Sequence, residues 1–417
     1  MLRDNLITGL DIGSTAIRVV VGQKSRGEEK LKIIGAIEVP AQGISKGVVT
    51  NVEDAVSSIS SALEKVERMI GQPIEHAWVG ISGSHIIDQE SKGVVAVSKA
   101  DGEIREEDVE RVIEAAKAVA TPPNYEILHV IPKSFIVDSQ TGIKDPIGMS
   151  GIRLEVETQI VQGLTSQIKN ITKCIYRTGI DIDDLVLSIL ATSESVLTTR
   201  QKELGVVVVN LGGATASMAV FEENDVLHTA VLPVGSEYVT NDVALGLKIS
   251  IDTAEKIKIR EGGCLPSSLK KNDIVKYSGL GAPEDGEFSK KEVAEIIEAR
   301  MEEILENVDK ELKKIGKSGM LPAGVVLTGG GAKLNGVIDV AKNTLRLPAS
   351  LGYPQELISN IGKVSDLSFT TAIGLVLWGS QLQDRGRKGG IIPRRIGGSV
   401  ENAISHLKKL LKNILPS

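Results

Sequence analysis

Three glycine-rich segments, each directly after an apolar run, constrain the fold of this chain more than any other feature. In chain order they are Gly9–Thr15, Asn210–Thr215 and Thr328–Lys333. Glycine lacks a Cβ atom and adopts positive φ readily, so such a turn can bring backbone N–H groups close to a phosphate. One turn of this kind is usually only a turn. Three of them, near the start, in the middle and in the last quarter, predict two similar halves that hold a nucleotide between them.

Composition places the chain among ordinary globular proteins. It has 417 residues, of which 41% are hydrophobic and 24% charged, so we expect two or more domains. No apolar run in the sequence approaches the roughly 20 residues that cross a bilayer. The sequence contains neither G-x-x-x-x-G-K-[ST] nor G-x-G-x-x-G, so no motif supports a P-loop or a dinucleotide-binding fold.

Hydrophobic periodicity predicts alternating strands and helices along the body of the chain. The expected strands are Ile7–Leu10, Ile17–Val21, Ile33–Val39, Trp78–Ile81, Val94–Val97, Tyr125–Val137, Ile152–Val161, Leu185–Leu190, Val206–Val209 and Ser217–Phe221. The expected helices are Val52–Ile70, Arg105–Ala120, Ser166–Tyr176, Thr192–Arg200, Val239–Leu247, Ile251–Arg260, Ser289–Ile315, Leu334–Leu345 and Thr370–Gln381. Within this pattern, residues 84–164 form a separate small α+β unit.

The last part of the chain differs in charge from the rest. The net charge is −6, yet from Arg385 onward eight basic residues stand against Glu401 alone. We expect a flexible basic linker over 383–399 and an amphipathic helix over 400–417 that lies on a membrane surface. A helix docked on the body of the protein is the alternative. The residues expected to contact lipid are Val400, Ile404, Leu407, Lys408, Leu411, Lys412, Ile414 and Leu415.

Asp11 stands at the end of an expected strand, inside the first glycine turn. In a cleft between two halves, this carboxylate is placed to hold a hydrated divalent cation on the phosphates. The alternative is a turn residue that caps Gly13 or Ser14. The presence of the other two glycine turns favours the ligand role.

Taken together, the three glycine turns resemble the phosphate and adenosine motifs of the actin, heat-shock-chaperone and sugar-kinase superfamily. Within it, the chain resembles the bacterial cell-division family FtsA over essentially its whole length. The stretches that carry the closer resemblance are Gly43–Gly47, His129–Lys133, Gly142–Gly151, Thr240–Ala244 and the basic tail.

This resemblance implies an α/β, actin-like (ribonuclease H-like) two-lobed fold with an extra α+β subdomain and a C-terminal amphipathic helix. The implied subdomains are 1A (1–83, continued by 165–204 and 358–382), 1C (84–164), 2A (205–224, continued by 301–357) and 2B (225–300). The linker of 383–399 and the helix of 400–417 follow them.

The resemblance also implies that ATP and Mg²⁺ are the cofactors. The residues that match the family's nucleotide motifs are Asp11, Gly13, Ser14, Thr15, Asn210, Gly212, Gly213, Thr215, Glu255, Lys258, Gly329, Gly330 and Gly331. Asp11 would reach Mg²⁺ through water. For Glu255 and Lys258, a surface pair three residues apart is the alternative interpretation.

The second turn departs from the superfamily pattern. Asn210 stands where the pattern has an aspartate, and Ala214 stands where it has a glycine. Asn keeps a carbonyl acceptor but lacks the charge that helps hold an attacking water. Loss of a positioned general base lowers a rate by on the order of 10²-fold or more. We therefore expect ATP binding with slow or negligible hydrolysis. Whether the chain is an enzyme stays open, and no catalytic residue is identified.

For function, the resemblance implies a peripheral protein on the cytoplasmic side of the cell membrane at the division site. Such a protein forms filaments with itself, binds anionic lipid, anchors the FtsZ ring and helps recruit later division proteins through residues 84–164. Arg300 matches an arginine that contacts the C-terminal peptide of FtsZ, and an exposed helix charge is the alternative. No nucleic-acid partner is expected. A type IV pilus assembly platform and a small-molecule kinase of the same superfamily are the alternative functions.

Overall fold

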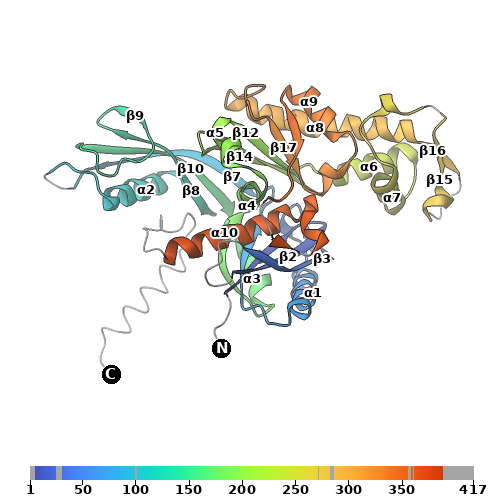
Figure 1. Ribbon diagram of the computed structural model, residues 1–417, viewed down its shortest axis with the longest axis horizontal. Helices are drawn as coiled ribbons and strands as arrows, with labels where there is room; N and C mark the ends of the chain where they lie inside the picture. The colour runs from blue at the N-terminus through green and yellow to red at the C-terminus, as the bar shows by residue number, and fades with distance from the viewer. Residues whose placement is uncertain are drawn as a thin grey trace.

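The computed structural model describes residues 5–24, 31–98, 101–270, 272–281, 286–355, 358–359 and 361–387. They form two lobes, one above the other in Figure 1, with a smaller sheet-containing unit extending to one side. The expected amphipathic helix and the expected linker from residue 388 onward lie outside the described residues. The first part of the expected linker is helical, because helix α10 (Thr370–Arg387) continues past Gln381. No helix in the described part of the chain combines the length and apolarity needed to traverse a bilayer.

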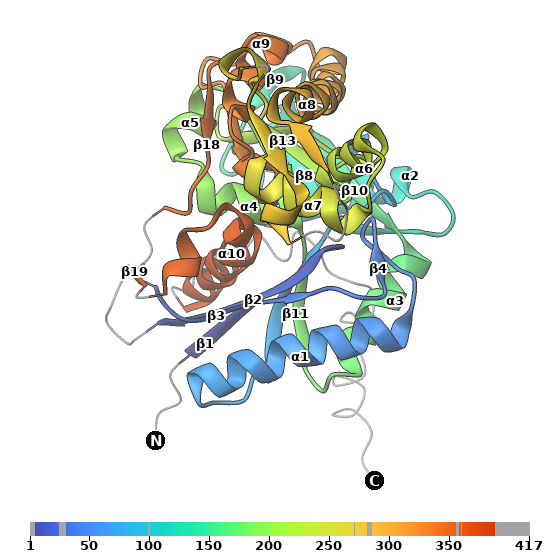
Figure 2. The ribbon, with the colours of Figure 1, turned by 90° about the vertical axis from the view of Figure 1, so that its right-hand side faces the viewer.

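The first lobe is built on a six-stranded sheet with the order β11-β6-β1-β2-β3-β19. An antiparallel meander of β1, β2 and β3 occupies its centre, and β6 and β11 run parallel to β1 on one side. The strands are β1 (Asn5–Ile12), β2 (Ala16–Lys24), β3 (Lys32–Pro40), β6 (His76–Ile81), β11 (Asp181–Leu187) and β19 (Ile358–Ser359). Helix α1 (Val52–Ile70) lies below this sheet and α10 lies above it in Figure 2.

The bounds predicted for α1 are confirmed, and local signals explain why. The Asn51 side chain accepts hydrogen bonds from the backbone N–H groups of Glu53 and Asp54 at the start of the helix. Gly71, at φ 71°, ends it and donates to the Glu67 carbonyl. These are the N-cap and left-handed C-cap that helix termini prefer. Its buried face is lined by Ala55, Ser58, Ile59, Ala62, Leu63 and Val66.

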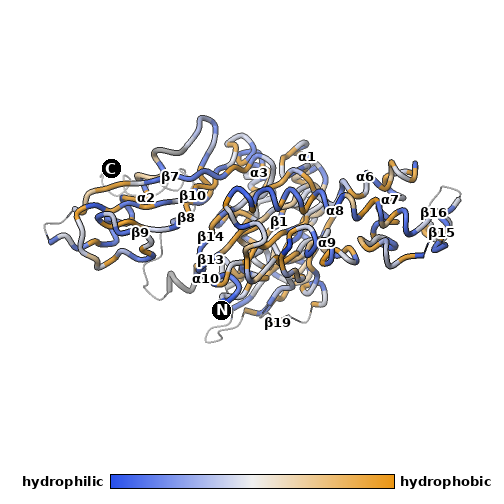
Figure 3. The backbone as a smooth tube through the Cα atoms, turned by 90° about the horizontal axis from the view of Figure 1, so that it is seen from above, coloured by the Kyte–Doolittle hydropathy of each residue, from blue (hydrophilic) through white to orange (hydrophobic). Residues whose placement is uncertain are grey.

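The second lobe repeats the arrangement of the first. Its five-stranded sheet has the order β14-β13-β12-β17-β18, and β12 pairs antiparallel with β13 and parallel with β17, as β1 does with β2 and β6. The strands are β12 (Val206–Leu211), β13 (Ala216–Glu222), β14 (Asp225–Leu232), β17 (Val325–Thr328) and β18 (Ala349–Leu351). The helices around it are α6 (Ser236–Leu247), α7 (Ile251–Glu261), α8 (Lys290–Lys314) and α9 (Val337–Leu345). Polar and apolar segments alternate along the chain around both sheets (Figure 3), as expected for elements with one buried face.

The inserted unit is a four-stranded antiparallel sheet covered by one helix. Its strand order is β7-β10-β8-β9, and α2 packs on β7 and β10. The elements are β7 (Ile86–Ala96), α2 (Glu106–Ala120), β8 (Tyr125–Val137), β9 (Gln140–Ile143) and β10 (Arg153–Leu164). Strand β7 is longer than the expected Val94–Val97. Its exposed polar residues Asp88, Gln89 and Glu90 pair with β10 and interrupt the hydrophobic signal.

The unit contacts the second lobe through charged side chains. His228 on β14 lies between two acids, with Nδ1 3.3 Å from Asp88 Oδ2 and Nε2 3.2 Å from Glu311 Oε2. Lys144, after β9, forms ion pairs with Asp225 and Glu223.

Several predicted elements were wrong in detail. The strand predicted over Leu185–Leu190 ends at Leu187, and helix α4 (Ser188–Val196), buried at every residue except Glu194, follows it. A short apolar run cannot distinguish a buried strand from a buried helix, which explains the error. A separate helix α5 (Thr199–Leu204) then begins, because Thr198 and Gln201 form a capping box in which each side chain accepts a hydrogen bond from the other's backbone N–H. Strand β14 was missed, and α9 starts at Val337 rather than Leu334 because Gly336 takes φ 82°.

Short elements complete the fold. They connect the longer helices and strands, and two of the 3₁₀ turns contribute Gly330, Gly331, Lys333 and Ser368 to the space between the lobes. They are the hairpin β4 (Ile44–Ser45) and β5 (Val48–Val49), helix α3 (Thr165–Tyr176), strands β15 (Ile274–Lys276) and β16 (Glu287–Ser289), and 3₁₀ turns at Pro266–Ser268, Tyr277–Leu280, Gly330–Lys333, Gly362–Ser365 and Leu367–Phe369.

Candidate functional site

A cleft of about 520 Å³ lies between the two lobes. All thirteen residues that the sequence nominated for nucleotide contact line it, although they come from three segments and from α7, far apart in the chain. The glycine turns of the two lobes meet there. The tertiary structure thus brings the whole predicted set into one place.

The first two glycine turns have the same geometry. The Gly13 N–H donates to the Ala16 carbonyl at 3.1 Å, and the Gly212 N–H donates to the Thr215 carbonyl at 3.0 Å. A Cβ atom at either glycine would lie within 2.8 Å of that carbonyl oxygen, so only glycine fits. Because the Gly13 N–H is used in this way, it is not capped by Asp11, which weakens the turn-capping alternative for that residue.

Asp11 is held in a low-polarity position at the base of the cleft. Its side chain is only 14% exposed, and burial raises its pKa to about 6, against the opposing effect of the Arg18 guanidinium 3.9 Å away. Arg18 also donates to Glu38 at 2.7 Å, so one cation serves two acids. A buried carboxylate with this little compensation is the kind of group that a hydrated divalent cation would stabilise. The donor chemistry therefore fits Mg²⁺.

Asn210 turns its amide away from the cleft opening. Its Nδ2 donates to the Thr371 hydroxyl at 3.0 Å, and Thr371 in turn lies 2.9 Å from the Thr192 hydroxyl. Its Oδ1 faces Gly329, where a Cβ atom would lie only 2.2 Å from it. Gly329 takes φ 86° and therefore needs to be glycine on two grounds. The second and third glycine turns pack directly on each other at this point.

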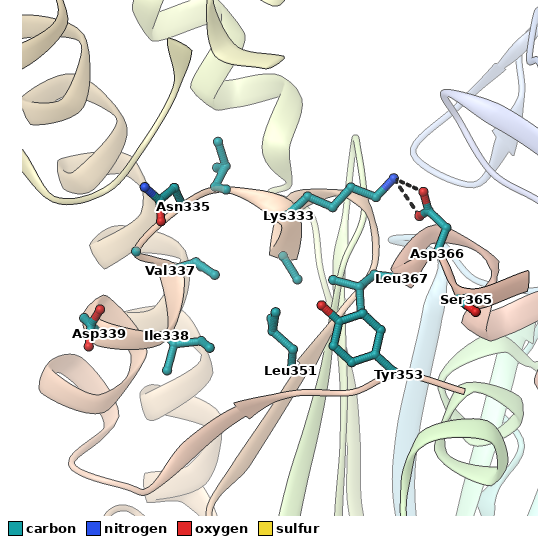
Figure 4. Close-up of a pocket in the computed structure, with 13 residues that line it drawn as sticks. Lys333, Asn335, Val337, Ile338, Asp339, Leu351, Tyr353, Ser365, Asp366 and Leu367 are labelled. Atoms are coloured by element: carbon teal, nitrogen blue, oxygen red, sulfur yellow. Dashed lines mark hydrogen bonds and ion pairs between the residues drawn. The ribbon is translucent and has the colours of Figure 1, made fainter. Parts of the chain in front are cut away.

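The lysine of the third turn lines both the cleft and a neighbouring pocket. Lys333 Nζ lies 2.6 Å from both carboxylate oxygens of Asp366, which Figure 4 shows beside a neighbouring pocket of about 550 Å³. Burial alone would raise the pKa of Asp366, but hydrogen bonds from Lys333 and Ser368 hold it below its ordinary value. Leu351, Tyr353 and Leu367 form the apolar side of this pocket.

Both members of the pair on α7 line the cleft. Lys258 Nζ lies 2.6 Å from Glu255 Oε2 and donates to the Thr240 hydroxyl at 2.8 Å and to the Ser236 carbonyl at 3.3 Å. The Thr240 hydroxyl also donates to Glu255. Only 11% of the Lys258 side chain is exposed, whereas 41% of the Glu255 side chain is, so the surface-pair interpretation does not describe the lysine but still describes the glutamate.

Two contacts that the sequence did not reveal join the lobes across the cleft. The Thr15 hydroxyl donates to Glu237 Oε1 at 3.0 Å, and Lys46 Nζ donates to the Tyr238 hydroxyl at 2.9 Å. The backbone N–H of Gly47 donates to the Ser14 hydroxyl at 3.3 Å. Lys46 and Gly47 belong to the Gly43–Gly47 stretch, so that motif was a signal for the contact made by Lys46. Glu237 is a single glutamate in the first turn of a helix, and no sequence motif marked it as a cleft residue.

Arg300, the residue assigned to a partner peptide, is engaged within the chain. It makes a bidentate pair with Asp242, at 2.5 and 3.0 Å, and contacts Glu303 at 2.6 Å. Its guanidinium lies over the Tyr238 ring, 5.7 Å from the centroid. The alternative of a freely exposed helix charge does not describe this arrangement. An acidic peptide that binds here has to displace Asp242 or Glu303.

Family models match two parts of the chain. The model described as "SHS2 domain inserted in FTSA" matches residues 83–162, which cover the inserted unit except the last two residues of β10, and the model described as "Cell division protein FtsA" matches residues 207–374.

Curated relatives extend the match to most of the chain. The cell division protein FtsA of Pseudomonas aeruginosa is 38% identical over 381 residues, covering 91% of both chains. That of Bacillus subtilis is 38% identical over 376 residues, covering 90% of this chain and 84% of the relative. That of Borreliella burgdorferi is 40% identical over 381 residues, covering 91% and 92%.

Solved structures establish the fold class. A type IV pilus biogenesis complex, PilM–PilN, contains a chain that aligns with a TM-score of 0.64 at 15% identity, covering 89% of this chain and 98% of its own. MreB5 of Spiroplasma citri bound to ADP aligns with a TM-score of 0.54 at 11% identity, covering 93% and 99%. At this identity the likeness concerns the fold alone, and the fold is actin-like with the inserted unit as predicted.

Proposed function

The chain belongs to the FtsA family of bacterial cell division proteins, and from this premise we propose that it is an ATP-binding membrane adaptor for the division ring. The observation that carries the nucleotide part of the proposal is the convergence of all thirteen nominated residues on one interlobe cleft. We further propose the division into subdomains 1A, 1C, 2A and 2B at the boundaries given above.

In this proposal each part of the cleft has its own task. The backbone N–H groups of the two glycine turns, with the hydroxyls of Ser14 and Thr15, bind the phosphates. Lys258 and Glu255, fixed by Thr240, hold the ribose and base. Mg²⁺ bound through water near Asp11 would neutralise phosphate charge. Hydrolysis is slow because Asn210 supplies no carboxylate and is held by Thr371.

Equilibrium binding of ATP to the purified full chain tests this part. We expect Asp11→Asn and Lys258→Met each to weaken ATP binding by at least about tenfold, since a charge-assisted contact contributes about 1.5–3 kcal/mol. Lys65→Met, at an exposed position on the outer face of α1, is the matched control and should leave the affinity unchanged. A wild-type chain that fails to bind ATP at saturating concentration would refute the proposal.

The membrane part rests on the sequence of residues 400–417. Full burial of one Leu or Ile contributes about 1.5–3 kcal/mol, and interfacial burial gives part of that. Each nearby Lys or Arg adds about 1 kcal/mol on an anionic leaflet. Folding a short helix that is marginal in water opposes both. The sum is weak, reversible binding by one copy, and a filament would strengthen it by about 10²–10⁴ through multivalency.

Sedimentation with anionic vesicles tests the membrane part. We compare the full chain at low and high concentration with a chain that ends at Ser399. Binding should require the tail and should rise more steeply than linearly with concentration. Equal sedimentation of all three samples would refute the proposal that the tail binds the membrane.

The partner part concerns FtsZ and the later division proteins. We propose that the acidic C-terminal peptide of FtsZ binds at Arg300 and that residues 84–164 contact later division proteins. In the free chain Asp242 forms an ion pair with Arg300 and so competes with the peptide for its guanidinium. Asp242→Asn should therefore tighten peptide binding, and Arg300→Gln should weaken it. Arg260→Gln, on the exposed face of α7, is the control. Recruitment of FtsZ to vesicles by the full chain separates this function from a pilus-assembly role, which predicts none.

A further inference from the structure

The contact between Thr15 and Glu237 closes the phosphate end of the cleft. Thr15 lies in the turn between β1 and β2, and Glu237 lies in the first turn of α6, so their hydrogen bond of 3.0 Å joins the two lobes. Both side chains sit over Gly213. A Cβ atom at Gly213 would lie 2.0 Å from the Thr15 hydroxyl oxygen and 2.9 Å from Glu237 Oε1. The Thr15 and Glu237 side chains therefore lie directly against Gly213 of the second turn.

Backbone hydrogen bonds fix the position of Glu237. Its N–H donates to the Gly213 carbonyl at 2.8 Å, and the Ser236 N–H donates to the Gly212 carbonyl at 2.9 Å. The Ser236 hydroxyl donates to the same Gly212 carbonyl at 3.0 Å. The start of α6 can approach the second glycine turn this closely because residue 235 is glycine, since a Cβ atom there would lie 2.3 Å from the Gly213 carbonyl oxygen. The carboxylate therefore stays attached to the second phosphate turn.

Among the described acids that line the cleft, Glu237 alone has no cationic partner. Asp11 and Glu38 share Arg18, and Glu255 pairs with Lys258. In the described part of the chain, the Glu237 carboxylate has one hydrogen-bond partner, the Thr15 hydroxyl. A carboxylate without a compensating cation, placed between two turns suited to phosphate, opposes the binding of an anion there.

We propose that Glu237 is a specificity-determining residue of the cleft, which competes with the terminal phosphate of a nucleoside triphosphate for the Thr15 hydroxyl. This inference rests on the proposed nucleotide site. The nucleoside end of that site is at the third turn and α7, so the phosphates extend toward Thr15 and the terminal one meets Glu237. A diphosphate ends earlier and avoids most of the repulsion.

The consequence is a cation requirement that differs between nucleotides. A divalent cation bound among anions offsets their mutual repulsion. Binding of ATP should therefore depend on the cation through Glu237, whereas binding of ADP should depend on it much less. Removing the charge at position 237 should reduce the cation dependence of ATP binding and leave that of ADP binding almost unchanged.

The experiment measures the dissociation constants of ATP and ADP for the full chain, with excess Mg²⁺ and in EDTA. The variants are Glu237→Gln, which keeps an acceptor for Thr15 but removes the charge, and Glu237→Asp, which keeps the charge. Glu64→Gln, on the exposed face of α1, makes the same charge change away from the cleft. Thermal unfolding of each variant confirms that it is folded.

We expect Glu237→Gln to reduce the Mg²⁺ dependence of ATP binding by about tenfold, a change that corresponds to one partly screened like-charge contact. The Mg²⁺ dependence of ADP binding should change little, and Glu237→Asp and Glu64→Gln should behave as the wild type. Equal changes for ATP and ADP, or no change, would overturn the inference while leaving the nucleotide site intact. Failure of the wild type to bind either nucleotide would overturn the proposed function and this inference with it.

Discussion

The ammonium group of Lys46 donates a hydrogen bond of 2.9 Å to the hydroxyl oxygen of Tyr238, and the two residues belong to opposite lobes. The same ammonium lies 5.4 Å from the centroid of the Tyr238 ring. The Arg300 guanidinium also lies over this ring, with its Cζ 5.7 Å from the centroid. One aromatic side chain thus contacts the cation of a hairpin at the cleft and the cation assigned to a partner peptide. Tyr238 therefore links Lys46 of the first lobe to Arg300 of the second.

Breaking this contact should loosen α6. Lys46→Met keeps the apolar stem and removes the ammonium, and Tyr238→Phe keeps the ring and removes the hydroxyl. We expect each to lower the opening free energy of the α6 amides by about 1 kcal/mol, measured as roughly fivefold faster hydrogen exchange. The double variant should show little further change, since both remove one interaction. Additive effects, or faster exchange in the Lys65→Met control, would argue against the contact.

Two glycines of the cleft should respond differently to alanine. Gly213→Ala places a methyl group 2.0 Å from the Thr15 hydroxyl oxygen, so the interlobe contact has to break. Gly330→Ala meets no heavy atom within 4 Å, and its φ is ordinary. We expect Gly330→Ala to change the free energy of unfolding by less than about 1 kcal/mol.

Nucleotide binding should nevertheless fall in both of these variants, because both glycines lie where the backbone approaches the ligand in the proposed site. Isothermal titration with ATP and thermal unfolding of the same samples separate the two effects. Gly279→Ala, in an open turn away from the cleft, is the control for both measurements. Wild-type affinity in Gly330→Ala would exclude close approach of the third turn to the nucleotide.

Restoring an acid at position 210 should speed hydrolysis. The Thr371 hydroxyl, which now accepts from Asn210, can rotate and donate to an aspartate instead. We expect Asn210→Asp to raise ATP turnover by about 10²-fold, the size of a positioned general base. Asn210→Ala should not raise it. Several turnovers per second by the wild type, or no gain in Asn210→Asp, would contradict the assignment of slow hydrolysis to this residue.

His228 should make the attachment of the inserted unit pH-dependent. Burial acts to lower its pKa, but hydrogen bonds and charge from Asp88 and Glu311 outweigh burial and raise it above its ordinary value. Because the folded pKa lies above the unfolded one, the stabilisation is fully present below about pH 6.5 and is lost as the pH rises through the folded pKa.

The measurement for His228 is the thermal midpoint at pH 6 and pH 8.5, compared with His228→Gln. The wild type should lose more stability than the variant over this interval. His85 acts in the opposite sense, since burial lowers its pKa and its protonation opposes folding at low pH. It is present in both proteins, so the difference between them isolates His228. Identical pH profiles would show that the contact with Asp88 carries no net stabilisation.

Local signals allowed the sequence to predict much of the fold. The caps Asn51 and Gly71 define α1 by contacts within four residues, and the strand–turn–strand pattern around Gly13 and Gly212 defines both phosphate turns. Where the signal was only an apolar run, as at Ser188–Leu190, the prediction was wrong, because burial on all sides removes the periodicity that distinguishes helix from strand.

What the sequence determined by itself is the set of turns, caps and glycine positions, since each depends on the backbone freedom of a residue and on its immediate neighbours. What only the tertiary structure decided is which side chains meet at the cleft. Glu237 reaches Thr15 over 222 positions of chain, and Lys258 becomes a cleft residue because α7 packs against Thr240 on α6. The first pair depends on how the two lobes are placed against each other, and the second on how α6 and α7 pack within the second lobe. No local pattern in any of these residues records that placement.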